Sequence, residues 1–224
     1  MKQRDNPDMP DESSTNETMG TLAEMTNASP DKLARYYDQW SGSYDNDLAN
    51  IGYIAPAVAA ETLSKQDIDR TKPVLDAGCG TGLTGLQLQK CGFDRIIGLD
   101  ISTASLAKAR QKGCYQELKQ QNLNEPLNFT DDQFAAAQCV GTLTYVRNVA
   151  GLMREFCRVV CPGGVVLFTH RTDLYDDRFK SVIDEISTAG FWTPILHSGP
   201  STYLPGHADF GDEKTIIYDI YRVN

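Results

Sequence analysis

The sequence predicts an α/β domain built on a mostly parallel sheet. Segments typical of strands alternate with amphipathic helical segments from residue 73 onward, and a glycine-rich turn joins the first strand to the first helix. Hydrophobic residues make up 41% of the chain and charged residues 23%, which is typical of a globular protein. The 224 residues suffice to bury a full core.

The elements before residue 73 differ from the rest. Residues 1–28 hold two basic against six acidic residues and no aromatic, which predicts a disordered acidic tail, with an interaction tail as the alternative. Residues 29–66 are predicted to form a helical cap on the domain. Ser29 and Pro30 are typical of an N-cap and a first helical position, and Pro56 opens a second helix.

The Rossmann-like core is predicted to span residues 73–224 with seven strands. These are expected at 73–77, 95–100, 115–121, 134–140, 165–169, 193–197 and 215–223. Helices are expected to end near Cys91, to run from Ser102 to Lys112, and to follow the apolar face that begins at Val149. Pro162-Gly163-Gly164 should stop that third helix, and a fourth should close at Gly190.

The stretch Val74–Gly82 carries the clearest chemical signal, because glycines alternate at Gly78, Gly80 and Gly82 after a strand. Such glycines let a ligand approach the backbone, and the free N–H groups of the following helix point at it. Asp76 is expected to hold this turn or to accept from a ligand ammonium group. Asp100 ends the next strand, where a carboxylate can accept from two ribose hydroxyls. The pattern Gly80-x-Gly82-x-x-Gly85 also satisfies a dinucleotide fingerprint, so an NAD-dependent oxidoreductase remains an alternative.

Five ordered motifs resemble those of the class I S-adenosylmethionine-dependent methyltransferases. Val74–Gly82 and Ile97–Ser102 match the first two, and Gln121-Asn122-Leu123, Phe134–Tyr145 and Arg158–Gly164 resemble the later three. Ala135 and Asn122 stand where the family often has aspartate. Three segments suggest a closer resemblance to the methyltransferase-like proteins of the Williams–Beuren syndrome region: Tyr37-Asp38-x-Trp40, Tyr44-Asp45-x-Asp47 and Gly52-Tyr53-x-Ala55-Pro56.

The resemblance implies a seven-stranded, mostly parallel sheet with helices on both faces, and S-adenosylmethionine as the cofactor. It also implies a set of cofactor-binding residues, in which aromatic side chains lie near the sulfonium and Asn122 accepts from the adenine amino group. That set is Tyr37, Trp40, Tyr44, Asp76, Gly78, Cys79, Gly80, Thr81, Gly82, Asp100, Ile101, Asn122, Leu123, Cys139 and Val140.

The resemblance names no fixed catalytic residue, because a sulfonium-bound methyl is already a good electrophile. The protein must place a nucleophile in line with it and exclude water, and it needs a base only for a protonated acceptor. His170 and Tyr145 are the candidates for that role, and Tyr203 and His207 can line the substrate side. Cys157 and Cys161 lie at core positions of a helix, so no metal site is expected.

The composition of the chain limits the kinds of partner that it is expected to bind. The net charge of −9 argues against nucleic acid and anionic membranes, and no apolar run is long enough for a membrane span. Without a secretory signal, the chain is expected to be cytoplasmic with reduced cysteines, and a monomer is favoured. The short acidic chain lacks an Asn/Asp-Pro-Pro-Tyr segment after the fourth strand, which favours a small-molecule acceptor. Protein methylation and cofactor binding without catalysis are the alternatives.

Overall fold

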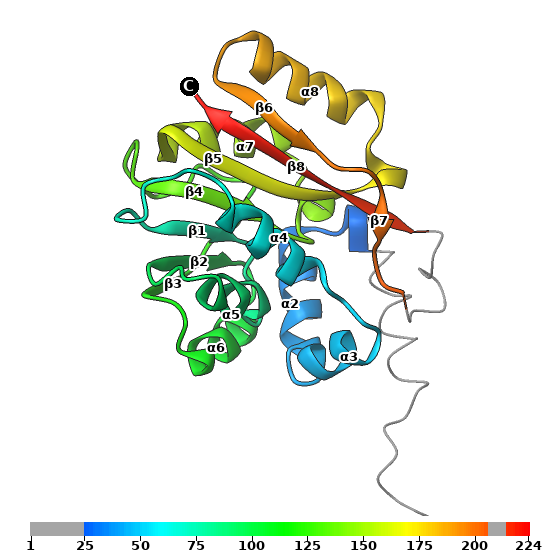
Figure 1. Ribbon diagram of the computed structural model, residues 1–224. Coiled ribbons are helices and arrows are strands. Elements are labelled where there is room, and N and C mark those ends of the chain that lie inside the picture. Colours follow the sequence, from blue (N-terminus) through cyan, green and yellow to red (C-terminus); the bar gives the residue numbers. More distant parts are fainter. Residues whose placement is uncertain (1–24, 206–213) are drawn as a thin grey trace, which may run out of the picture.

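The computed structural model describes residues 25–205 and 214–224, which form a twisted sheet with helices on both faces (Figure 1). Most of the predicted acidic tail lies outside the described residues. Residues 25–28, which the prediction placed in that tail, instead belong to the domain. Met25–Asn27 form a short 3-10 helix, η1, and Met25 is buried. Within the described ranges no helix is long and apolar enough to cross a membrane.

The sheet has the order β3-β2-β1-β4-β5-β8-β6, so the seven predicted strands are all present. Their bounds are β1 Val74–Ala77, β2 Ile96–Asp100, β3 Glu117–Gln120, β4 Phe134–Cys139, β5 Val160–Arg171, β6 Trp192–His197 and β8 Thr215–Val223. The first five strands are parallel, and β8 runs antiparallel to both β5 and β6. A two-residue strand, β7 (Ser201–Thr202), pairs with β8 and was not predicted.

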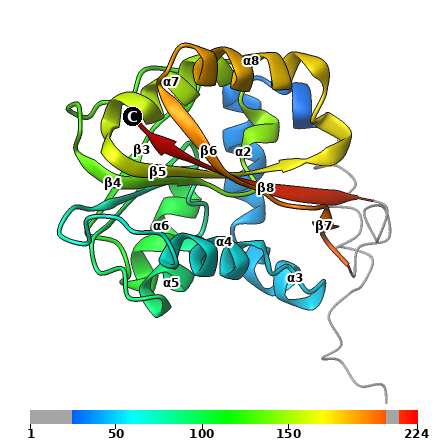
Figure 2. The same cartoon turned by 45° about the horizontal axis from the view of Figure 1, so that its top comes forward.

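Helices cover the two faces of the sheet in two groups (Figure 2). On one face lie α4 (Ala55–Ser64), α5 (Leu83–Lys90) and α6 (Thr103–Lys112). On the other lie α7 (Val149–Val159) and α8 (Asp177–Thr188). The predicted apolar face of α7 is confirmed, because Leu152, Met153 and Phe156 are almost fully buried against the sheet.

The junction between α7 and β5 differs from the prediction. The helix ends at Val159, and β5 begins at once and continues through Pro162-Gly163-Gly164. Phe134 pairs with Val160 and Ala136 with Val165, so the intervening residues of β5 form a bulge. A Cβ on Gly164 would lie 2.5 Å from the carbonyl oxygen of Ala135, which explains the glycine at this close approach. The Pro-Gly-Gly segment therefore shapes a strand rather than a turn.

The predicted N-terminal cap consists of α2 (Pro30–Trp40), α3 (Tyr44–Asn50) and α4. Ser29 is the N-cap of α2, as expected, and accepts from the backbone N–H of Lys32. Asp38 joins α2 to the start of α6, accepting from Ser102 Oγ at 2.6 Å and from the Ala104 N–H at 3.0 Å. This tie holds α2 across the carboxyl edge of the parallel strands.

Candidate functional site

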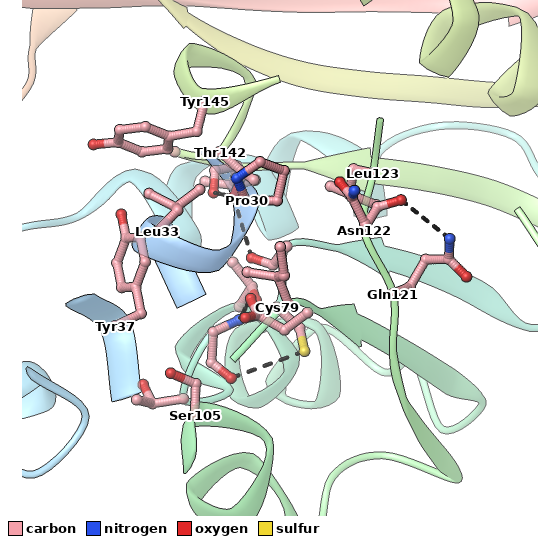
Figure 3. Close-up of a pocket in the computed structure, with 18 of the residues that line it drawn as sticks. Pro30, Leu33, Tyr37, Cys79, Ser105, Gln121, Asn122, Leu123, Thr142 and Tyr145 are labelled. Carbon is pink, nitrogen blue, oxygen red and sulfur yellow. Dashed lines mark hydrogen bonds between the residues drawn. The ribbon is translucent and has the colours of Figure 1, made fainter. Parts of the chain in front are cut away.

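The glycine turn between β1 and α5 forms the floor of a cavity of about 300 Å³ at the carboxyl edge of the sheet (Figure 3). Gly78 has φ +78°, and a Cβ there would lie 2.3 Å from Thr142 Oγ1, so only glycine fits. Gly80 has φ +53°, but a Cβ there would meet no protein atom within 4 Å. The protein therefore leaves the space beside Gly80 open.

Asp76 lies beneath the turn and is fully buried. Its carboxylate accepts from Thr84 Oγ1 at 2.5 Å, Tyr115 Oη at 2.7 Å and Gln138 Nε2 at 3.1 Å. Burial raises the pKa of this carboxyl group, and the three donors oppose that shift. Of the two roles predicted for Asp76, the contacts support the first, because it ties β1, α5 and β4 together and does not line the cavity.

Asp100 stands on the cavity wall where β2 ends. Its two oxygens accept from the Gly80 N–H and from the Ser102 N–H, each at 2.8 Å. Burial raises its pKa to about 6, against the effect of those two N–H groups. The carboxylate is thus fixed by backbone donors on both sides, and each oxygen keeps a lone pair for a further donor.

The loop after β3 forms the opposite wall, with Gln121, Asn122 and Leu123 on the far side of the cavity from Tyr37 and Tyr145 (Figure 3). The amide oxygen of Asn122 accepts from the backbone and side-chain nitrogens of Asn124, both at 3.0 Å. The oxygen that was expected to accept from an adenine is therefore already engaged within its own loop. Asn122 shapes the wall, and Leu123 offers an apolar surface beside it.

Of the three predicted aromatic contacts, the cavity is lined by Tyr37 and Tyr44 but not by Trp40. Trp40 is 5% exposed, donates from Nε1 to Asp47 Oδ2 at 2.7 Å, and packs edge-on against Tyr44 at 4.4 Å between ring centroids. It lies behind the wall because the side of α2 that Trp40 occupies faces α3. The helical spacing identified the aromatic helix but did not show which of its side chains meets the cavity.

The remaining residues of the predicted cofactor-binding set also divide into those that line the cavity and those that do not. Cavity-lining positions are Gly78, Cys79, Gly80, Thr81, Asp100, Ile101, Asn122, Leu123 and Val140. Gly82 and Cys139 do not line it, because Gly82 caps α5 against Ala109 and Tyr115 and Cys139 is fully buried within β4. Burial raises the pKa of the Cys79 thiol well above its ordinary value, so this thiol stays protonated.

The two catalytic candidates are placed very differently. Tyr145, in the 3-10 helix η2 (Leu143–Tyr145), lines the cavity with its ring 6.1 Å from that of Tyr37. His170 does not reach it: its side chain is buried on the other face of the sheet, 4.1 Å from the Phe179 ring. Strand alternation sends His170 toward α8, and burial lowers its pKa. The expectation that His170 acts as a base is wrong on these grounds.

Tyr203 packs against Tyr53 at 5.9 Å between ring centroids, behind the lining, and His207 lies outside the described residues. The sequence prediction did not assign a further group of lining residues, which come from the N-terminal cap and the residue before it, from α5 and α6, and from the loops after β3 and β4. They are Ala28, Pro30, Leu33, Tyr53, Pro56, Leu83, Thr84, Ser105, Gln121, Asn124, Gly141, Thr142, Arg147 and Asn148. The only sequence signal for them was that they lie in or near the recognised motifs.

A family model described as a methyltransferase domain matches residues 75–168. Methyltransferase-like protein 27 from Homo sapiens is 33% identical over 168 residues, which cover 72% of this chain and 68% of that protein. The chain belongs to the class I S-adenosylmethionine-dependent methyltransferases. The closer resemblance to the methyltransferase-like proteins is confirmed by the same match.

Demethylmenaquinone methyltransferase from Chlorobaculum parvum is 29% identical over 78% of this chain and 77% of its own. A solved S-adenosylmethionine-dependent methyltransferase from Mesorhizobium loti has a TM-score of 0.60 at 19% identity, covering 75% of this chain and 97% of that one. The antiparallel β8 between β5 and β6 also separates this sheet from the all-parallel dinucleotide-binding order. The cofactor is therefore S-adenosylmethionine, and the NAD-dependent alternative is wrong.

Proposed function

We propose that this methyltransferase transfers the methyl group of S-adenosylmethionine to a small-molecule acceptor by in-line displacement within the cavity above the glycine turn. The observation that supports this most is that residues of the N-terminal cap form one side of the cavity. Tyr37 from α2, Tyr44 from α3 and Tyr53 before α4 all line it, and Asp45 ties α3 to the turn through Thr81 Oγ1 and Lys112 Nζ. A cavity bounded in this way suits an acceptor of limited size.

The residues present fit the cofactor in three respects. The space beside Gly80 accommodates a ligand against the backbone, the fixed carboxylate of Asp100 would accept from the ribose hydroxyls, and Leu123 and Ile101 would pack on the adenine. When bound, the cofactor supplies an electrophilic methyl group on a sulfonium. Tyr37 and Tyr44 would present ring surfaces to that positive charge, an interaction of about 0.5–2 kcal/mol.

Position and desolvation are what this chain contributes to the reaction. The cap residues would limit the access of water to the bound reactants, and the glycine turn and Asp100 would fix the cofactor relative to the acceptor side. Relatives named for methylation of demethylmenaquinone and trans-aconitate support a small-molecule acceptor for this chain as well.

An acceptor screen tests the proposal. The purified protein is incubated with S-adenosylmethionine labelled in its methyl group, together with either a panel of small metabolites or a set of basic peptides. We expect label to appear in the small-molecule fraction and S-adenosylhomocysteine to form in step with it. Label that appears only in peptides would show that the acceptor is a protein, and unchanged cofactor binding without transfer to either set would favour a binding protein.

A further inference from the structure

The acceptor end of the cavity is walled by tyrosine. Tyr37, Tyr44, Tyr53 and Tyr145, here called the tyrosine chamber, come from α2, α3, the loop before α4 and η2, and all four line the cavity. Figure 3 shows Tyr37 and Tyr145 on the side away from Asn122. The rings of Tyr37 and Tyr44 are 6.3 Å apart between centroids, and those of Tyr37 and Tyr145 are 6.1 Å apart. Gly141 admits the hydroxyl of Tyr53, since a Cβ there would lie 2.8 Å from it. The chamber therefore combines flat apolar faces with hydroxyl groups, of which those of Tyr37 and Tyr145 are hydrogen-bonded to each other.

Apart from Asp100, no proton acceptor suited to neutral pH stands among the described residues that line the cavity. They include no histidine, lysine or glutamate, and their titratable groups are the four chamber tyrosines, Cys79, Asp100 and Arg147. Burial raises the pKa of each chamber tyrosine and of the Cys79 thiol. Asp100 is assigned to the ribose, and Arg147 carries no lone pair for a proton. The tyrosine hydroxyls are consequently donors at neutral pH.

Positive charge lies directly behind the chamber. Arg171 Nη2 and Lys214 Nζ both contact Asp173 Oδ2, at 2.6 Å and 2.7 Å, so three charged groups leave a net charge of +1. Arg171 interacts electrostatically with Tyr145 and Tyr203, whereas the carboxylates of Asp100 and Asp45 act in the opposite sense on Tyr44. The positive charge therefore lies on the Tyr145 side of the chamber. Charge and hydroxyl donors together favour a negatively charged group inside the chamber.

On the basis of the proposed function, we propose that the acceptor is a small hydroxylated aromatic ring that binds and reacts as its phenolate, without a base from the described residues that line the cavity. The ring lies between tyrosine faces, and chamber hydroxyls donate to the phenolate oxygen. That oxygen attacks the methyl carbon, the carbon–sulfur bond breaks, and its electron pair stays on sulfur. The products are a methyl ether and S-adenosylhomocysteine, and no proton moves in this step.

The surroundings of the tyrosine chamber favour an anionic phenolate over a neutral amine as the acceptor. A phenolate and a sulfonium attract each other strongly in a low-dielectric chamber, and their charges cancel as the new bond forms. A neutral amine would instead end as an ammonium ion beside the tyrosines, with no described lining group to take its proton. Phenolates are therefore the better match.

A series of para-substituted phenols tests this inference. The rate of S-adenosylhomocysteine formation is measured against pH for 4-nitrophenol, 4-cyanophenol and 4-methylphenol, with benzylamine as the amine comparison. We expect kcat/KM to rise with pH through each phenol's own pKa, so that the break moves with the substituent, and we expect no transfer to benzylamine. A break at one fixed pH for all phenols, or preferred methylation of benzylamine, would overturn the inference.

A second readout does not depend on turnover. The absorbance of 4-nitrophenol distinguishes phenol from phenolate, so titration into the complex with S-adenosylhomocysteine reports the bound form directly. We expect bound phenolate below the probe's solution pKa. Tyr145→Phe should weaken this binding about tenfold, through loss of one donor to an anion, while S-adenosylhomocysteine affinity is unchanged. Tyr221→Phe, the same substitution on the opposite face of the sheet, is the matched control.

The two proposals fail in different ways. A protein that does not bind S-adenosylhomocysteine contradicts the proposed function itself. A protein that binds it but takes up neutral 4-nitrophenol, or none, contradicts only the phenolate inference.

Discussion

Replacement of Asp100 by asparagine should weaken cofactor binding while leaving the fold intact. Each carboxylate oxygen already accepts one backbone N–H, from Gly80 or from Ser102, and each has one remaining lone pair for a ribose hydroxyl. A hydrogen bond to a charged group contributes about 1.5–3 kcal/mol, and asparagine keeps one neutral acceptor in place of two charged ones. The expected loss is about 1.4–3 kcal/mol, or roughly 10- to 150-fold in affinity.

Isothermal titration calorimetry with S-adenosylhomocysteine measures this loss directly. Asp94→Asn is the matched control, because Asp94 is an exposed acid just before the opposite end of β2. It makes the same change of charge just before the same strand and should leave affinity unchanged. Equal affinities for Asp100→Asn and the native protein, with both variants folded, would refute the placement of the ribose at the end of β2.

Three further predictions concern the same region. Affinity for S-adenosylhomocysteine should fall as pH drops below about 6 in the native protein but not in Asp100→Asn, because the Asp100 carboxyl group then carries a proton. The stability of the free protein has the opposite dependence on pH. It should fall as pH rises from about 4 to 6, since the folded state retains a proton on Asp100 that the unfolded state has released. Gly80→Ala and Gly92→Ala both place alanine at positive φ in open space, so each should lower the free energy of unfolding in urea by about 1–2 kcal/mol. Only Gly80→Ala lies beside the cavity, so only this variant should also lose ligand affinity in calorimetry. Asp76→Ala should lower the free energy of unfolding by about 3 kcal/mol, because it leaves three buried donors without an acceptor; a loss below about 1 kcal/mol would contradict the tying role.

Local motifs in the sequence predicted the core of the site. The strand–turn–helix pattern around Gly80 and the acid at the end of the next strand fix their own geometry, because backbone conformation and strand ends decide where these groups lie. The seven strands and the cap followed from periodicity and from proline and serine at helix starts. These features depend on neighbours in the sequence, which is why a single chain sufficed to predict them.

The errors arose where tertiary packing decides. Trp40 and Tyr37 share a helix, but only the docking of α2 on α3 and α6 determines which one meets the cavity. His170 was expected to follow a strand that ends at Thr169, but β5 continues to Arg171, and the alternation of side chains along the strand turns His170 toward α8. Asn122 carries the expected acceptor, yet its own loop engages it. Tyr53 belongs to a motif that supported the resemblance, but no local pattern shows that this loop residue reaches Gly141 and lines the cavity.

Thermal unfolding with and without ligand tests most directly whether the cavity is an S-adenosylmethionine site. The melting temperature is recorded for the protein alone and with S-adenosylmethionine, S-adenosylhomocysteine or NAD. A ligand at about 100 times its dissociation constant adds roughly 2.7 kcal/mol, which raises the melting temperature by about 5–11 °C for a protein of this size. We predict that rise with both adenosyl ligands and none with NAD. A rise with NAD alone, or no rise with any of the three ligands, would contradict the assignment of the cavity as an S-adenosylmethionine site.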